Sequence, residues 1–349
     1  MCRTLAIQYD VTLIAIHPVA ELKEGIRIIP FRRYHKRKFR IAFGWLIMFF
    51  KALKVNARVY HLHDPELIPC GLLLRLAGKQ VILDIHENIA EDIFDKPWIR
   101  RQKLAYRIFS VFERLACRYF SILLAEVSYE KRYSRLNARY TTVQNFCDTG
   151  FFEPLAKATY AHGLNLYYIG IILENRGILQ IAEALKLLAD EGHTAHFHCV
   201  GELYSDLERK LKALPYYESI SGQLHFYGRM PLEKGYAIVN QMDIGLCLIW
   251  PMKNSRESYP TKLFEYMCCG LPIITSDFDL YREAVEGNDC GICVDPLQSS
   301  ELKNAVLSIH RDVKKSELMA ENGKKAVREK YDWKSQIPIL SKVYEDLCR

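Results

Sequence analysis

The 349-residue sequence lacks an apolar run long enough to cross a bilayer. The apolar run at 41–50 has ten residues, whereas a membrane-spanning helix needs about 20. No signal peptide precedes the eleven cysteines, and these show no regular disulfide spacing, so we predict reduced thiols in the cytoplasm. No predicted strand is followed by Gly-x-Gly-x-x-Gly, which disfavours a dinucleotide oxidoreductase.

The charge of the chain is unevenly distributed. Residues 1–150 contain 25 Lys and Arg against 14 Asp and Glu, although the net charge of the whole chain is only +7. Eight of these basic residues fall within 32–54, without one acid, on either side of the apolar run. Such a segment fits an anionic membrane surface or a phosphate-bearing lipid. The alternatives are a solvated basic loop followed by a core helix, and a nucleic-acid site, for which no recognisable module is present.

Short apolar runs rich in Val, Ile and Leu alternate with longer helical patterns, which is typical of βαβ units with parallel sheets. We therefore predict an α/β protein with two doubly wound, Rossmann-like domains. Breakers at 147–163 indicate a linker, so we expect domains at 1–149 and 150–330 and a final helix at 331–349 that crosses back to the first domain. The predicted strands are 11–16, 26–30, 59–63, 81–86, 122–127 and 141–145 in the first half, and 166–170, 196–201, 224–228, 244–249, 272–276 and 291–294 in the second.

The beginning of the chain departs from the doubly wound pattern. Such domains open with a strand, a glycine-rich turn and a helix. Here residues 2–5 have the pattern of the end of a helix, and the first predicted strand follows after a short turn. We therefore expect the N-terminal domain to lack its first strand.

The segment before the fifth strand of the second half carries the most chemical information. A helix over 262–269 can begin after Pro260 and end at Gly270. Lys262 adds positive charge to a helix N-terminus that is already electropositive, which favours a bound anion such as a diphosphate. Glu265, one turn further on, can accept two hydrogen bonds from ribose hydroxyls. The alternative is an ordinary surface ion pair between Lys262 and Glu265.

This segment resembles the Glu-x7-Glu region of the family-4 retaining glycosyltransferases of the GT-B fold, in the branch with Pro-Thr-Lys-Leu-Phe-Glu-Tyr-Met followed by Gly-x-Pro. The resemblance covers nearly the whole chain, because further matches occur in the expected order. They are His61-Leu62-His63-Asp64-Pro65, Asp84-Ile85-His86-Glu87, Gly170 with Arg176-Gly177, and Cys290-Gly291-Ile292-Cys293-Val294-Asp295-Pro296.

The resemblance implies that the C-terminal domain holds a nucleotide-diphosphate sugar, that the N-terminal domain holds the acceptor, and that the reaction takes place in the cleft between them. Glu265 would bind the ribose and Glu257 the transferred sugar. Arg176 and Lys262 would neutralise the departing diphosphate, and His86 would contact the sugar or the acceptor hydroxyl. The candidate catalytic residues are thus His86, Glu257, Arg176 and Lys262, and the candidate substrate-binding residues are Glu265, Gly170, Gly228, Arg229, Thr261 and Asp64.

The resemblance also implies a reaction without a metal or another cofactor. No Asp-x-Asp motif in a suitable loop indicates a Mg²⁺ site. His61 and His63 on one strand face would fit a metal, but the sequence suggests no third ligand. One departure from the family pattern is Ile171, which follows Gly170 where many relatives have a second glycine.

We therefore predict a metal-independent hexosyltransferase that acts with retention on a lipid-linked or saccharide acceptor in bacterial surface polysaccharide biosynthesis. It would be cytoplasmic, and peripheral on the inner face of the plasma membrane where its basic half meets anionic lipid. Nucleic acid is not an expected partner. Two alternatives stay open: a truncated, non-catalytic remnant that still binds nucleotide, and a nucleotide-sugar epimerase with the same architecture.

Overall fold

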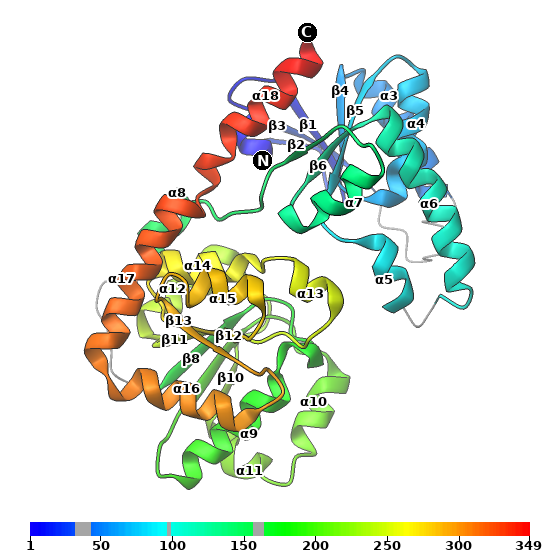
Figure 1. Cartoon of the computed structure of the whole chain (residues 1–349). Coiled ribbons are helices and arrows are strands. Elements are labelled where there is room, and N and C mark those ends of the chain that lie inside the picture. Colours follow the sequence, from blue (N-terminus) through cyan, green and yellow to red (C-terminus); the bar gives the residue numbers. More distant parts are fainter. Residues whose placement is uncertain (32–42, 96–98, 156–163) are drawn as a thin grey trace. The chain divides into compact units, whose positions relative to one another are not determined.

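The computed structural model describes residues 1–31, 43–95, 99–155 and 164–349, which fall into two compact units (Figure 1). The first unit consists of Met1–Gln144 and Lys334–Arg349, and the second of Asn145–Trp333. Each unit contains a parallel sheet and helices, as the predicted α/β class requires.

The chain passes into the second unit earlier than the domain boundary expected at 149/150. Cys147 and Phe152 are buried in the core of the second unit, and the backbone of Cys147 pairs with that of Asp332. The first part of the segment expected to be a linker is therefore packed, because it contributes apolar side chains to a core. The remainder, 156–163, lies outside the described residues.

The second unit contains one parallel sheet of six strands in the order β10-β9-β8-β11-β12-β13. In chain order this is 3-2-1-4-5-6, and doubly wound domains with that order bind ligands where the order reverses, here between β8 and β11. All six predicted strands of this half are confirmed to within two residues at either end. They are β8 (Asn165–Ile169), β9 (His196–Val200), β10 (Leu224–Phe226), β11 (Ile244–Cys247), β12 (Ile273–Ser276) and β13 (Gly291–Val294).

Helices cover both faces of this sheet (Figure 1). Leu166 and Tyr168 of β8 pack on one face with residues of α9 and α16. Tyr167 and Ile169 pack on the other face with α12, α14 and α15. Because alternate residues of one strand enter two cores, the strand is apolar along its whole length. The helices are α8 (Thr149–Phe152), α9 (Ile178–Asp190), α10 (Ser205–Lys212), α11 (Tyr217–Ile220), α12 (Leu232–Ala237), α13 (Lys253–Glu257), α14 (Thr261–Cys269), α15 (Asp279–Val285), α16 (Ser299–Arg311) and α17 (Val313–Lys330).

The strands of the first unit form two sheets. One is fully parallel in the order β4-β5-β6-β7, and the other has the order β1-β3-β2. The six predicted strands of this half are confirmed to within three residues, whereas the exposed strand β2 was not predicted. The strands are β1 (Val11–Ala15), β2 (Glu21–Lys23), β3 (Ile26–Pro30), β4 (Val59–Leu62), β5 (Gln80–Ile85), β6 (Ser121–Leu124) and β7 (Tyr140–Thr142).

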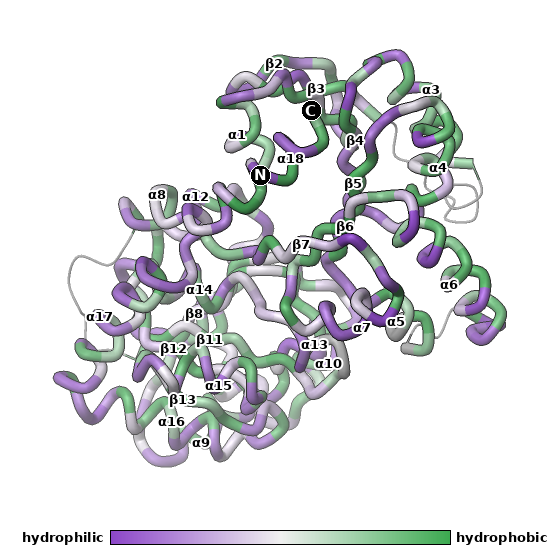
Figure 2. The backbone as a smooth tube through the Cα atoms, turned by 45° about the horizontal axis from the view of Figure 1, so that its top comes forward, coloured by the Kyte–Doolittle hydropathy of each residue, from purple (hydrophilic) through white to green (hydrophobic). Residues whose placement is uncertain are grey.

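Several helices of the first unit pack against the core of the four-stranded sheet. Hydrophobic and hydrophilic residues alternate along α6 (Figure 2), and Ala116 and Cys117 lie on its buried face. The terminal helix α18 contacts β4 through Tyr344, whose hydroxyl lies 2.7 Å from Nδ1 of His61. The helices are α1 (Cys2–Leu5), α3 (Trp45–Val55), α4 (Ile68–Leu76), α5 (Ile89–Asp95), α6 (Gln102–Tyr119), α7 (Glu130–Arg135) and α18 (Ile337–Cys348).

The basic segment of the first half can be followed only in part, because residues 32–42 lie outside the described residues. Directly after it, Trp45 and Phe49 of α3 pack against the core of the first unit, while Phe50 is 57% exposed. Among the described helices, none combines the length and apolar character needed to cross a bilayer. All eleven cysteines fall within the described ranges, and none of them forms a disulfide.

Candidate functional site

The helix predicted over 262–269 is present as α14, Thr261–Cys269. It begins after Pro260 and ends at Gly270, whose φ of +72° is left-handed and whose N–H donates to the Met267 carbonyl. The helix buries one face in the core, so that Lys262 and Glu265 are half-buried on its other side. Its first turn contains no acid that would balance Lys262.

Lys262 lies over the carboxyl end of β8. Its Nζ is 5.2 Å from the centroid of the Tyr168 ring, and a Cβ added to Gly170 would lie 3.4 Å from that Nζ. The surface ion pair between Lys262 and Glu265, considered as an alternative, does not form, because each residue has a different partner. Lys262 is therefore held at the point where the strand order reverses.

Three glycines with positive φ follow three adjacent strands: Gly170 after β8 at +136°, Gly201 after β9 at +158° and Gly228 after β10 at +70°. The Gly201 N–H donates to the Gly228 carbonyl over 3.0 Å. A Cβ on Gly201 would lie 2.0 Å from the Gly170 carbonyl oxygen. The backbones therefore approach so closely that only glycine fits. Gly201 was not predicted as a site residue, although a glycine at a strand's carboxyl end is a visible signal.

Arg176 ends a short 3-10 turn, Glu174–Arg176, immediately before α9. The next residue, Gly177, has a φ of +73°, and a Cβ there would lie 2.9 Å from Cβ of Leu248. Burial raises the pKa of Cys247 in β11, and Lys262 and Arg176 both act in the opposite direction. The two cations thus act on the same part of the sheet, each beside a helix N-terminus, which is the arrangement that binds phosphate.

Glu265 is oriented by a residue that the sequence analysis missed. The hydroxyl of Tyr236, in α12, donates a hydrogen bond to Oε2 of Glu265. Tyr236 is fully buried, and burial together with the Glu265 charge raises its pKa well above the usual value, so this hydroxyl stays a donor. Within the described residues Oε1 of Glu265 has no partner, which leaves it available to a ligand.

The remaining candidates of the second unit lie on the segments around α14. Glu257 is the last residue of α13 and is half-buried. Two contacts hold α13 against α15. The Tyr281 hydroxyl of α15 donates to the Ser255 carbonyl over 2.7 Å. Arg256 lies over the ring of Phe278, the residue directly before α15. Thr261 begins α14. Arg229 is exposed on the loop after β10, next to Gly228.

The candidates of the first unit gather around Asp84, near the end of β5. One of its oxygens, Oδ2, lies 3.0 Å from Nε2 of His86, 3.3 Å from Nε2 of His61 and 3.3 Å from Nδ1 of His63. Burial would raise the pKa of Asp84, but these three histidines outweigh it and hold that pKa far below its usual range. The contact with Asp84 raises the pKa of His86, against the effect of burial.

His86 and Asp64 line a cavity of about 300 Å³ in the first unit. Ile68 and Leu83 form part of its apolar wall, and Glu87 part of its polar wall. Asp64 itself is exposed, just before a 3-10 turn. The structure therefore places these two candidates in one cavity of the first unit, while the other eight belong to the second unit.

The structure brings a third residue with a possible metal-ligand atom beside the two histidines, which the sequence did not suggest. Ligand atoms of His61, His63 and Asp84 all lie within 4.8 Å of one another. The premise for excluding a metal at the His-x-His pair is thus wrong, since the missing ligand comes from the neighbouring strand. The imidazole and carboxylate donors are those that Zn²⁺ accepts.

Part of the chain, including the candidate residues of the second unit, is similar to a known protein family. Residues 161–326 match the family described as Glycosyl transferases group 1. An uncharacterized glycosyltransferase of Methanocaldococcus jannaschii is 24% identical over 191 residues, which are 55% of this chain and 47% of that protein. A phosphatidyl-myo-inositol mannosyltransferase of Mycobacterium leprae is 32% identical over 92 residues, which are 26% of this chain and 24% of that protein. The chain thus spans about half or less of the length of these curated relatives.

Among solved structures, HepE of Anabaena in complex with UDP and glucose superimposes with a TM-score of 0.73. The alignment covers 99% of this chain and 94% of HepE at 13% identity, so it establishes the fold alone. The segment that matches the group 1 glycosyltransferases contains Gly170, Arg176 and all of α14, and the structural likeness shows that the chain has the GT-B fold. The predicted resemblance is confirmed at this level.

Proposed function

We propose that the protein transfers a sugar of the hexose type from a nucleotide-diphosphate donor, bound by the second unit, to an acceptor bound by the first, with retention at the anomeric carbon. The observation that carries this proposal is the position of Lys262 and Arg176 at the glycine-lined end of β8, with Glu265 one helical turn away. The UDP and glucose bound by HepE support a nucleotide-sugar donor.

The second unit would act by stabilising the leaving group. When the bond between the sugar and the diphosphate breaks, negative charge develops on the phosphate oxygens, and Lys262 and Arg176 would neutralise it together with the N-termini of α9 and α14. Glu265 would fix the ribose and Glu257 the transferred sugar. Thr261 would adjoin the diphosphate, and the Gly228 loop with Arg229 would border the base.

The first unit would hold the acceptor in the cavity beside His86 and Asp64. His86 would contact the acceptor hydroxyl or the transferred sugar, and Asp84 would keep its imidazole oriented. The basic first half of the chain and the mycobacterial relative, named for a phosphatidyl-inositol substrate, support a lipid-linked acceptor, with a saccharide as the other option. We propose a role in bacterial surface polysaccharide assembly, in the cytoplasm and peripheral at the inner face of the plasma membrane.

We further propose that the transfer requires no metal or other cofactor, because two cationic side chains already serve the diphosphate. The cluster of His61, His63 and Asp84 would then be a structural support for His86. Dialysis against EDTA separates these roles. Unchanged turnover supports the proposal, and a loss that Zn²⁺ restores would assign a metal to the cluster.

A calorimetric panel of UDP-, GDP- and ADP-sugars tests the donor site. We expect one class to bind, and Lys262→Ala and Glu265→Ala each to weaken it by about ten- to hundredfold, which corresponds to about 1.5–3 kcal/mol for a lost charged hydrogen bond. Lys186→Ala is the control, since Lys186 pairs with Asp190 on α9 away from the site. Equal affinities of all these proteins would refute the assignment.

Product analysis separates the proposal from its alternatives. A transferase consumes the donor only when an acceptor is present, whereas an epimerase converts the donor alone. A folded chain that binds the nucleotide but shows no turnover with any acceptor tested would be the non-catalytic remnant.

A further inference from the structure

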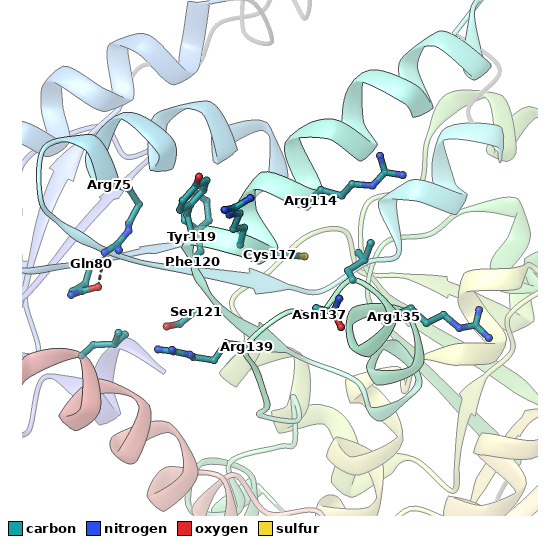
Figure 3. Close-up of a pocket in the computed structure, with 13 residues that line it drawn as sticks. Arg75, Gln80, Arg114, Cys117, Tyr119, Phe120, Ser121, Arg135, Asn137 and Arg139 are labelled. Atoms are coloured by element: carbon teal, nitrogen blue, oxygen red, sulfur yellow. Dashed lines mark hydrogen bonds between the residues drawn. The ribbon is translucent and has the colours of Figure 1, made fainter.

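The first unit contains a pocket of about 730 Å³ at the amino edge of its parallel sheet (Figure 3). Gln80 and Ser121, the first residues of β5 and β6, line it, as does Arg139, which directly precedes β7. His86 follows β5 at the carboxyl edge. The pocket shares no lining residue with the cavity beside His86, so it is a separate site.

Arginine dominates the polar lining of this pocket. None of the lining residues is an Asp or a Glu. Arg75 donates hydrogen bonds to neutral groups, the Lys79 carbonyl at 2.9 Å and Oε1 of Gln80 at 2.6 Å. Among the described residues no ion pair neutralises any of the lining arginines. They are Arg75, Arg114, Arg118, Arg135 and Arg139.

Helix dipoles explain part of this charge. Arg75, Arg118 and Arg135 lie in the last turns of α4, α6 and α7, where a cation is favourable. This effect does not account for Arg139, which lies in a loop, or for Arg114, which lies more than a turn from the end of α6. It also does not explain why three helices end at one acid-free pocket.

We propose that this pocket binds an anion with at least two negative charges on phosphate, either a free diphosphate or the phosphorylated headgroup of a lipid. Guanidinium groups bind phosphate oxygens in pairs. In Figure 3, Arg75 and Arg139 extend from different elements toward Gln80 and Ser121. The pocket has the volume of a site for a small organic molecule, and Tyr119, 48% exposed, offers a ring to the group that carries the phosphate.

This inference goes beyond the proposed transfer and does not depend on it, because the pocket lies in the first unit and the donor-binding cations in the second. Its test therefore uses the Lys262→Ala background, in which the donor site is weakened. The pocket variant is R75Q/R139Q, which removes the two arginines that extend toward Gln80 and Ser121. The matched control is R107Q/K131Q, which removes the same charge from exposed residues of the first unit outside the pocket.

Two probes distinguish the two sources of phosphate. The first is pyrophosphate, followed by calorimetry, and the second is sedimentation with phosphatidylcholine vesicles that contain or lack phosphatidic acid, whose phosphomonoester headgroup can carry two negative charges. We expect at least one probe to bind the parent and the control, and R75Q/R139Q to weaken that binding by about tenfold or more, as expected for lost charged hydrogen bonds. Circular dichroism confirms that each variant is folded.

The pattern of binding distinguishes the outcomes. Loss of pyrophosphate binding alone assigns a free diphosphate, and loss of vesicle binding alone assigns a lipid headgroup. If the pocket and control variants lost binding equally, general surface charge would account for the binding, and the proposal would be overturned. The proposal is also overturned if neither probe binds the parent protein.

Discussion

The ribose contact proposed for Glu265 can be tested by removing one atom from the ligand. Oε2 of Glu265 accepts from Tyr236, so Oε1 is the oxygen left for a ribose hydroxyl. A hydrogen bond to a charged carboxylate is worth about 1.5–3 kcal/mol, or about ten- to hundredfold in affinity. We expect the protein to bind its nucleoside diphosphate that much more tightly than the 2′-deoxy analogue. Glu265→Ala should bind both ligands equally.

Calorimetry of both ligands against four proteins completes this experiment. Tyr236→Phe keeps the carboxylate but removes the donor that orients it, so its discrimination should be intermediate. Glu233→Ala, an exposed carboxylate on α12, is the matched control and should discriminate like the parent protein. If Glu265→Ala still preferred the ribose form by the original factor, the 2′-hydroxyl would be bound by another residue.

Two further predictions concern the end of β9, where Gly201 lies, and the end of β5, where Asp84 lies. In Gly201→Ala the new Cβ would lie 2.0 Å from the Gly170 carbonyl oxygen. Urea denaturation should therefore show a free energy of unfolding about 1–3 kcal/mol lower than that of the parent protein. Gly222→Ala is the control and should be neutral, because nothing lies within 4 Å of its Cβ. Asp84→Asn should lower the pKa of His86, measured by NMR, because the carboxylate raises it. Since the pKa of Asp84 is depressed in the folded state, the stability it contributes is present above its ordinary value of 3.8 and is lost as the pH falls below it. Asp84→Asn should therefore lose less stability than the parent protein on acidification, and an unchanged His86 pKa would show that Asp84 does not control it.

The helix that carries the proposed donor site could be predicted from the sequence because its signals are local. Pro260, Lys262, Glu265 and Gly270 lie within one short helix, so a start signal, a charge, a one-turn spacing and a stop signal determine their relative positions. The strands of the second half were equally predictable, since strands buried on both faces are continuously apolar. Tyr236 could not be assigned to this site, because it comes from another helix and its hydroxyl meets Glu265 only after packing.

The first unit was less predictable for the same reason. Asp84 lies on β5 and His61 and His63 at the end of β4, and their contact depends on the register of two neighbouring strands. The strand β2 was missed because Glu21–Lys23 is exposed and has no apolar pattern. Its signal lies in the turn, where Glu24 and Gly25 have φ of 51° and 77°, as a two-residue hairpin turn requires.

The cations of the two proposed sites differ in their position relative to helix dipoles. In the first unit, Arg75, Arg118 and Arg135 follow the rule that cations stabilise helix C-termini. Lys262 breaks that rule, because it lies in the first turn of α14 with no acid beside it, at a cost of about 0.3–1 kcal/mol. Lys262→Ala removes this cost together with the contact over the Tyr168 ring, which is of similar size, so the free protein should change little in stability. A loss of donor affinity in this variant would then report on binding and not on unfolding. A cation in the first turn of a helix with no acid beside it fits the anion binding that we propose for this site.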